Sequence, residues 1–218
     1  ESMIKLVIFD LDGTLLNTID DLAAAGNHVC AAHGWPTHTS EQFRYFVGDG
    51  VYKLIERMTP AGAAETPETV QCLRDEFNAY YNSHSCDLTV PYTGVPELLK
   101  KLDARGIAAA VLSNKPDTFT QQLCANLLGG RFAVVHGQRE GRPTKPDESL
   151  TREILLQTCV RPDECIYVGD SGVDMRTAKN GGLFAVGALW GFRTRKELLE
   201  NGADALADSP LDVLEYIG

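Results

Sequence analysis

Short apolar runs alternate with longer amphipathic stretches over most of the chain. Several runs of four to six mainly apolar residues are bounded by turn-forming residues, a pattern typical of buried parallel strands. They are residues 4–9, 107–112, 132–135, 165–168 and 183–186. Helical patterns lie between them at residues 95–105, 117–128, 147–158 and 173–180. From residue 94 onward this alternation predicts an α/β fold with a doubly wound, parallel-sheet (Rossmann-like) core.

Residues 17–87 follow a different pattern. Strand-like runs are missing from this part of the sequence, and apolar residues recur at helical spacing, as at Leu22 and Ala25. Segments rich in Gly and Pro separate the helical patterns. We therefore predict an α-helical cap domain (17–87) inserted after the first strand of a catalytic core made of residues 1–16 and 88–218.

The composition limits the class of partner. Of 218 residues, 44% are hydrophobic and 23% charged, as in an ordinary globular protein. The 30 acidic residues outnumber the 20 Lys and Arg residues, and the resulting formal charge of −10 disfavours nucleic acid as a partner. A small anionic substrate then requires a metal ion or a local group of cations.

The sequence also bears on location. No stretch approaches the roughly 18 apolar residues of a membrane-spanning helix, so we expect no membrane partner. Glu1 and Ser2 precede an expected start at Met3, and no basic segment followed by an apolar one opens the chain. The 6 cysteines lack metal-ligand spacing and are expected to be free thiols. We expect a cytoplasmic monomer or homodimer.

Two pairs of acidic residues follow predicted strands. Asp10 and Asp12 end the first strand, and two like charges this close favour a hard cation such as Mg²⁺ between them. Asp170 and Asp174 follow the strand at 165–168, with Asp174 placed in the first turn of a helix. Taken alone, the first pair is also compatible with a plain turn and the second with a helix N-cap.

Polar residues follow two further predicted strands. Ser113 and Asn114 come directly after residues 107–112, at a strand-to-helix junction that suits an anion. Lys145 precedes Pro146, which we expect to start the next helix and hold the lysine in place. Taken alone, each is also ordinary loop composition.

The four motifs become specific together. The carboxyl ends of parallel strands share one edge of the sheet, so three carboxylates, one hydroxyl and one ammonium group are expected to converge. This set suits phosphoryl transfer to an aspartate, with Mg²⁺ and a lysine neutralising the phosphoryl group.

The motifs FDLDGTLL (9–16), Ser113-Asn114, Lys145-Pro146 and GDSGVD (169–174) resemble, in order and spacing, those of haloacid dehalogenase-like hydrolases with a C1 helical cap. Three further segments look like those of phosphoglycolate phosphatases. They are residues 18–36, 46–58 and 181–198.

This resemblance implies roles for individual residues. Asp10 is then the nucleophile and a Mg²⁺ ligand. Asp12 is the general acid and base, with its backbone carbonyl on the metal. Asp170 is a further Mg²⁺ ligand. Lys145 stabilises charge on Asp10 and on the phosphoryl group, and Asp174 orients Lys145 or a metal-bound water.

The resemblance also implies how substrate is held. Ser113 and the backbone of Asn114 bind the phosphoryl group. The cap closes over it. The candidates for contact with substrate are Thr14, Asn17, Gly48-Asp49-Gly50 and Arg57, with Lys53 next to them. For Gly48 the alternative is a plain turn between two helices. The favoured activity is hydrolysis of a small phosphomonoester, phosphoglycolate first, through an aspartyl-phosphate.

Other functions stay open. A sugar phosphomutase of the same superfamily shares the aspartyl-phosphate, although such enzymes commonly carry Gly-Val where this chain has Gly13-Thr14. A pyrophosphatase of the superfamily is a further alternative. Outside enzymes, a phospho-accepting signalling module also carries acidic residues, a hydroxyl and a lysine around a parallel sheet, but it does not require so long a helical insert.

Overall fold

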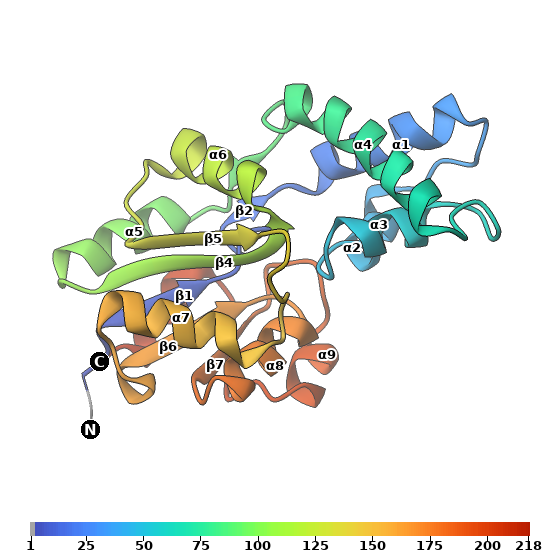
Figure 1. Ribbon diagram of the computed structural model, residues 1–218. Coiled ribbons are helices and arrows are strands. Elements are labelled where there is room, and N and C mark those ends of the chain that lie inside the picture. Colours follow the sequence, from blue (N-terminus) through green and yellow to red (C-terminus); the bar gives the residue numbers. More distant parts are fainter. Residues whose placement is uncertain (1–2) are drawn as a thin grey trace.

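The computed structural model describes residues 3–218, so Glu1 and Ser2, which precede the expected start at Met3, lie outside the described residues. A six-stranded parallel sheet forms the core, with strand order β5-β4-β1-β6-β7-β8 (Figure 1). Its strands are β1 (Leu6–Phe9), β4 (Ala108–Pro116), β5 (Val134–Gln138), β6 (Cys165–Gly169), β7 (Phe184–Ala188) and β8 (Ala205–Ala207). The predicted α/β fold with a parallel core is confirmed.

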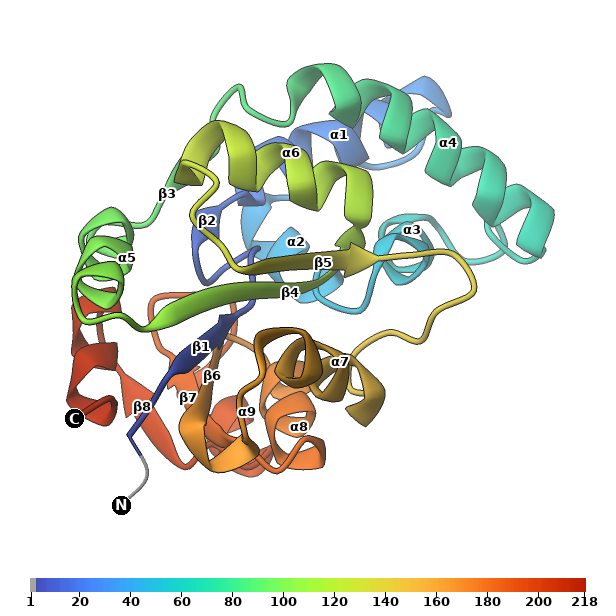
Figure 2. The same cartoon turned by 60° about the vertical axis from the view of Figure 1, so that its left-hand side comes forward.

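Helices cover both faces of the sheet (Figure 2). They are α5 (Val95–Ala104), α6 (Asp117–Leu128), α7 (Glu148–Thr158), α8 (Gly172–Asn180) and α9 (Arg195–Glu200), with short 3₁₀ helices at Pro162–Glu164 and Pro210–Tyr216. Successive residues of a strand point to opposite faces, so Val7 and Phe9 pack toward α5 and α6 while Leu6 and Ile8 pack toward α7 and α8. Because strand β1 is buried on both sides, its sequence is continuously apolar.

Four helices form the cap: α1 (Ile19–Ala32), α2 (Ser40–Phe46), α3 (Val51–Met58) and α4 (Pro67–His84). They lie between β2 (Leu16–Asn17) and β3 (Val90–Pro91), two short strands that pair antiparallel and bring the two ends of the insert together. The proposed division of the chain at residues 16/17 and 87/88 falls beside this pair. The cap has its own apolar core, which two core residues, Phe119 and Phe192, join at the junction.

Some element boundaries differ from the prediction. Strand β4 continues to Pro116, with an irregular register after Leu112, so Ser113 and Asn114 lie within the end of a strand and not after it. Helix α7 begins at Glu148 with Asp147 as its N-cap, so the prediction that Pro146 starts it was wrong. Strand β8 was not predicted because Ala205–Ala207 is too short to carry a pattern.

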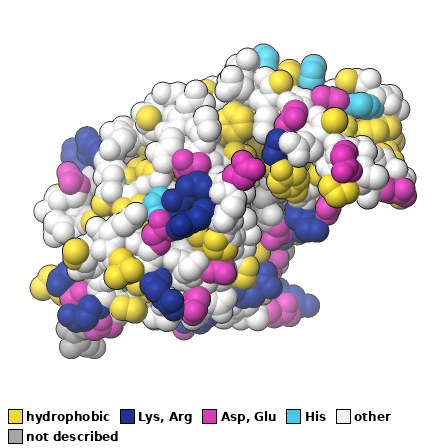
Figure 3. All heavy atoms as spheres, viewed as in Figure 1, with side chains coloured by type: hydrophobic (Ala, Val, Ile, Leu, Met, Phe, Trp, Pro, Cys, Tyr) yellow, Lys and Arg dark blue, Asp and Glu magenta, His cyan; other side chains and the backbone are white. Residues whose placement is uncertain are grey.

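Charged side chains of both signs are spread over the surface that Figure 3 shows, and the helices are of moderate length. On the face in Figure 3, basic and acidic side chains intermix and no large patch of one sign is visible. Among residues 3–218, no helix combines the length and apolar character that crossing a membrane requires.

Candidate active site

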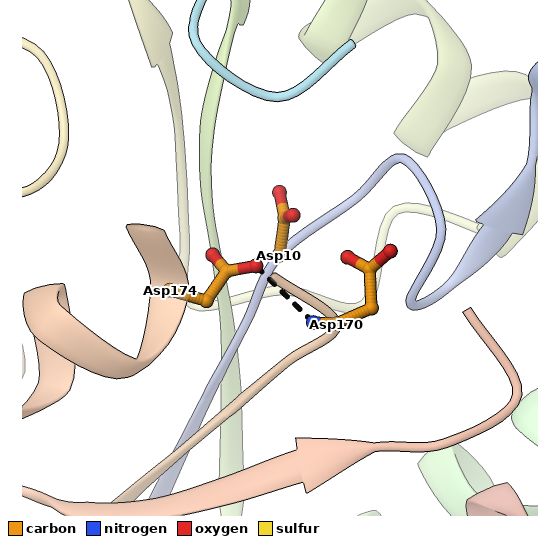
Figure 4. Close-up of side chains that lie close together, drawn as sticks. All are labelled: Asp10, Asp170 and Asp174. Atoms are coloured by element: carbon orange, nitrogen blue, oxygen red, sulfur yellow. Dashed lines mark hydrogen bonds between the residues drawn. The ribbon is translucent and has the colours of Figure 1, made fainter. Parts of the chain in front are cut away.

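Three buried carboxylates meet at the carboxyl edge of the sheet (Figure 4). Asp10 follows β1, Asp170 follows the neighbouring strand β6, and Asp174 lies in the first turn of α8. One oxygen from each lies within 4.8 Å of the others. Burial, and after it the Asp174 carboxylate, raises the pKa of Asp10 well above its ordinary value, and burial raises the pKa of Asp170 to about 7. Such a cluster holds its charge poorly unless a cation lies beside it.

Asp174 is committed to hydrogen bonds within the protein. Its Oδ1 accepts from Lys145 Nζ (2.8 Å) and Tyr167 Oη (2.9 Å). Its Oδ2 accepts from the Asp170 and Ser171 amides and from the Ser171 hydroxyl at 3.0–3.2 Å. Burial opposes ionisation of Asp174, but the Lys145 ammonium outweighs it and lowers the pKa of this carboxyl. The oxygens of Asp174 are thus occupied, and of the three clustered carboxylates only Asp10 and Asp170 line the cavity.

The Asp170 carboxylate is held from both sides. Thr14 Oγ1 donates to Oδ1 at 3.1 Å and the Phe192 amide donates to Oδ2 at 2.8 Å. Gly13 has φ +81°, and a Cβ there would overlap the Asp170 carboxylate. Thr14, expected to contact substrate, is fully buried and is not among the described residues that line the cavity. The structure therefore places Thr14 behind Asp170.

Lys145 is buried beside the carboxylates. Its Nζ lies 3.1 Å from Asp10 Oδ1 and 2.8 Å from Asp174 Oδ1, and it also donates to the Leu112 carbonyl at 3.2 Å. Burial works against its charge, but Asp10 and Asp174 outweigh burial and raise the pKa of Lys145 well above its ordinary value. An ammonium group is thus held beside the predicted nucleophile.

Asp12 lies outside this cluster. Its Oδ1 accepts a hydrogen bond from Thr18 Oγ1 at 2.6 Å and another from Lys115 Nζ at 2.8 Å. The Asp12 carboxylate lines the cavity near the cap, apart from the grouped Asp10, Asp170 and Asp174 oxygens. This place suits proton transfer with a leaving group, and the metal contact through the Asp12 backbone carbonyl stays a prediction.

Of the residues predicted to bind the phosphoryl group, Ser113 and Asn114 line the same cavity, whereas Lys145 lies behind Asp10 and is not among its described lining residues. Ser113 Oγ accepts from the Lys115 amide at 3.1 Å. Asn114 Oδ1 accepts from the Lys145 amide at 2.8 Å, and Asn114 Nδ2 donates to the Gly48 carbonyl of the cap at 3.1 Å. Asn114 therefore links Lys145 to the cap.

Of the predicted cap residues, Gly48 and Gly50 line the cavity, whereas Asp49, Lys53 and Arg57 do not. The Arg57 guanidinium pairs with Asp49 at 2.7 Å and donates to the Phe46 carbonyl at 3.1 Å. These contacts hold the loop that carries Gly48, so the structure gives Arg57 an indirect place at the site.

The cavity itself lies between the sheet edge and the cap and has a volume of about 50 Å³. Sequence reasoning gave no site role to several residues of its wall, among them Tyr81 of α4, Lys115 of β4 and Arg193, which lies in the loop after β7. Lys115 adjoins the Ser113-Asn114 step, and that adjacency is the signal that could have found it. The positions of Tyr81 and Arg193 in the site depend on how the cap sits on the core.

The donor set fits a hard divalent cation. Asp10 and Asp170 supply carboxylate oxygens at the cavity, and no histidine or cysteine belongs to the described cluster. Burial raises the pKa values of both carboxyls although the Lys145 ammonium lies beside them. All-oxygen sites of this kind suit Mg²⁺.

Comparisons with known proteins agree with this site. A family model described as haloacid dehalogenase-like hydrolase matches residues 7–188. The chain is 32% identical to the phosphoglycolate phosphatase of Vibrio vulnificus strain CMCP6, over 98% of this chain and 96% of that protein. The structure of a protein described as a putative phosphoglycolate phosphatase from Lactobacillus delbrueckii subsp. bulgaricus superposes with a TM-score of 0.91 at 31% identity, covering 99% and 98% of the two chains.

A further neighbour was solved with phosphate. CbbY from Rhodobacter sphaeroides, in complex with phosphate, superposes with a TM-score of 0.76 at 26% identity, over 95% of each chain. The relatives and the family match confirm the predicted class of enzyme, a phosphoric monoester hydrolase similar to phosphoglycolate phosphatases. With its motifs at one edge of a parallel sheet and its match over residues 7–188, the chain belongs to the haloacid dehalogenase-like hydrolases.

Proposed function

We propose that the protein is a Mg²⁺-dependent phosphatase that hydrolyses a small phosphomonoester, phosphoglycolate first, through an aspartyl-phosphate on Asp10. The observation that carries this proposal is the buried contact of Asp10 with Lys145 (3.1 Å), at the edge of a cavity that Asp10, Asp12 and Asp170 line. A nucleophile, a fixed cation and a separate carboxyl group for the proton are thus within one small site.

The two steps follow from these positions. In the first, an oxygen of Asp10 bonds to phosphorus, the bond from phosphorus to the ester oxygen breaks, and Asp12 gives a proton to that oxygen. In the second, Asp12 takes a proton from water, whose oxygen bonds to phosphorus as the bond to Asp10 breaks, and phosphate is released. Lys145 and Ser113 hold the phosphoryl oxygens in both steps.

Asp10 and Asp170 would hold the Mg²⁺ ion, together with the Asp12 backbone carbonyl. When bound, the ion supplies positive charge that offsets the phosphoryl dianion and the carboxylates around it. Thr14 and the Phe192 amide keep Asp170 turned toward that position.

The test is release of inorganic phosphate from a series of monoesters, with pyrophosphate and hexose phosphates included, in Mg²⁺ and in excess EDTA. Asp10→Asn is expected to reduce turnover by at least about a thousandfold, since the amide is a poor nucleophile. Asp103→Asn, at an exposed position of α5, is the matched control and should match the wild type. Near-normal turnover by Asp10→Asn would refute the nucleophile assignment.

The same experiment separates the alternatives. Turnover that requires a bisphosphate activator and yields an isomeric sugar phosphate would favour a mutase, and preference for pyrophosphate would favour a pyrophosphatase. An aspartyl-phosphate that persists for minutes without phosphate release would favour a signalling module.

We also propose a cytoplasmic location and a monomer or homodimer. Cys30, Cys124 and Cys165 are buried free thiols, which supports a reducing compartment. Light scattering of the purified protein measures the oligomeric state directly.

A further inference from the structure

The wall of the cavity opposite the carboxylates belongs mostly to the cap and is mainly apolar. Leu22, Val51, Leu54 and Phe77 contribute to it from three cap helices. A leaving group that extends from phosphorus toward the cap therefore meets few polar groups. Those few decide which leaving group is accepted, because a buried polar group without a partner is costly.

Two basic side chains line the cavity within the described residues, Lys115 and Arg193. Arg193 is already committed. Its Nε and Nη2 donate to the Arg44 and Val47 carbonyls at 3.0 and 2.9 Å, and its Nη1 pairs with Glu197 at 2.9 Å. Arg193 thus holds the cap and has little left to offer a substrate.

Lys115 is placed differently. Its Nζ donates to Asp12 Oδ1 at 2.8 Å and lies 4.6 Å from the centre of the Tyr81 ring. An ammonium group has three donors, and one of them is used by Asp12. The side chain is only 5% exposed, so a further anionic partner would be bound away from bulk water.

Tyr81 adds a neutral donor on the cap side. Its ring is fully buried, and its hydroxyl has no hydrogen-bond partner among residues 3–218. Asn78, one helical turn earlier, also lines the cavity, and its Oδ1 is likewise buried without a partner in the described chain. These groups in an otherwise apolar wall indicate a polar ligand.

The position of Lys115 beside Asp12 indicates how far from the ester oxygen a group bound by Lys115 would lie. If Asp12 protonates the ester oxygen, as the proposed function requires, Lys115 lies next to the atoms one or two bonds beyond that oxygen. In phosphoglycolate a single CH₂ group separates the ester oxygen from the carboxylate. The carboxylate then comes to the ammonium of Lys115.

We propose that Lys115 Nζ and the Tyr81 hydroxyl bind a carboxylate on the leaving group, and so select phosphomonoesters of short hydroxy acids over neutral ones. This inference rests on the proposed phosphatase activity. The contact of Lys115 with Asp12 defines the competing role, in which Lys115 only positions Asp12. A residue that only positions Asp12 affects all substrates alike, whereas one that binds the carboxylate affects only the anionic ones.

The experiment compares phosphoglycolate with phosphoglycolamide, in which an amide replaces the carboxylate. For each enzyme, kcat/KM for phosphoglycolate is divided by kcat/KM for phosphoglycolamide, both measured from phosphate release in saturating Mg²⁺. Differences in leaving-group reactivity cancel when the ratios of variant and wild type are compared. Lys115→Gln is expected to lower the ratio by roughly 10- to 100-fold, as for a lost charge-assisted hydrogen bond.

Two further variants complete the design. Lys101→Gln removes an exposed lysine of α5 and should leave the ratio at the wild-type value. Tyr81→Phe keeps the ring and the lysine and removes only the hydroxyl, so it should lower the ratio by about three- to tenfold. If thermal unfolding shows that Lys115→Gln does not fold, Tyr81→Phe decides the matter.

An equal loss for both substrates, or an unchanged ratio in the folded variants, would overturn the carboxylate site and leave the phosphatase proposal standing. Wild-type activity on other monoesters but not on phosphoglycolate would do the same. A wild-type protein that releases phosphate from no monoester would instead overturn the proposed function, and the carboxylate site with it.

Discussion

Arg193 of the core is hydrogen-bonded to the cap, and its replacement tests whether the contact between cap and core is needed for substrate binding. Arg193 donates from Nε to the Arg44 carbonyl (3.0 Å) and from Nη2 to the Val47 carbonyl (2.9 Å). A weaker contact reaches the Tyr45 carbonyl at 3.4 Å. These carbonyls end helix α2, where a cation is also favoured by the helix dipole.

The free energy that Arg193 contributes to cap closure can be estimated from its two shorter hydrogen bonds, to the Arg44 and Val47 carbonyls. A hydrogen bond from a charged donor contributes about 1.5–3 kcal/mol, and we take the lower value for both because the Arg193 side chain is 13% exposed. Water recovers part of that sum in the open state, which leaves about 2 kcal/mol for Arg193→Met. The equilibrium ratio of closed to open cap therefore falls about 30-fold in the variant.

Substrate binds the closed arrangement in this account, so the apparent affinity falls with the closed fraction. We expect Arg193→Met to raise KM by up to about 30-fold in phosphate-release assays at saturating Mg²⁺. Hydrogen exchange of the amides in residues 43–50 should speed up in the variant. Arg195→Met, two residues along at an exposed position, is the control and should change neither.

The reasoning would be refuted by an Arg193→Met variant with KM within twofold of the wild type and unchanged exchange at residues 43–50. Thermal unfolding should be measured alongside, because a large drop in Tm would mean that Arg193 stabilises the core as well as the cap.

Four shorter predictions concern the metal and the packing. Excess EDTA should abolish phosphate release, and added Mg²⁺ should restore it; activity retained after exhaustive chelation would contradict the metal site. Thr14→Val removes a hydrogen bond of 3.1 Å to Asp170 and should raise the Mg²⁺ concentration for half-maximal activity by about 10-fold; an unchanged titration would count against it. Gly26→Ala places a Cβ against the Phe43 ring and should lower the free energy of unfolding by about 1–3 kcal/mol in urea titrations, despite the better helix propensity of Ala. Asp21→Ala removes a buried carboxylate that accepts hydrogen bonds from the chain returning to the core, and should cost about 3 kcal/mol in the same assay.

Much of the core could be read from local pattern. Buried parallel strands are apolar over their whole length, so β1 and β6 are visible as runs of apolar residues, and the acids after them are visible as exceptions. Because neighbouring parallel strands end at one edge, the meeting of Asp10 with Asp170 and Lys145 also followed from the order of motifs.

Several features had no local signal. The extension of β4 to Pro116 depends on pairing with β5, and β8 is only three residues long. Thr14 and Arg57 were expected to contact substrate from their places in the sequence. The Thr14 side chain instead donates to Asp170, and the Arg57 side chain pairs with Asp49. Residue spacing alone does not show that these partners lie side by side.

The sequence by itself determined the sheet, the helical insert and the four groups of reactive side chains, because periodicity and strand ends are local properties. Only the tertiary structure decided which polar side chains outside the four motifs line the cavity. Lys115 and Tyr81 are 34 residues apart and belong to different domains, and they meet because the cap folds down over the sheet edge. That meeting depends on packing between the two parts of the chain, where long-range contacts and not residue spacing set which polar groups remain free.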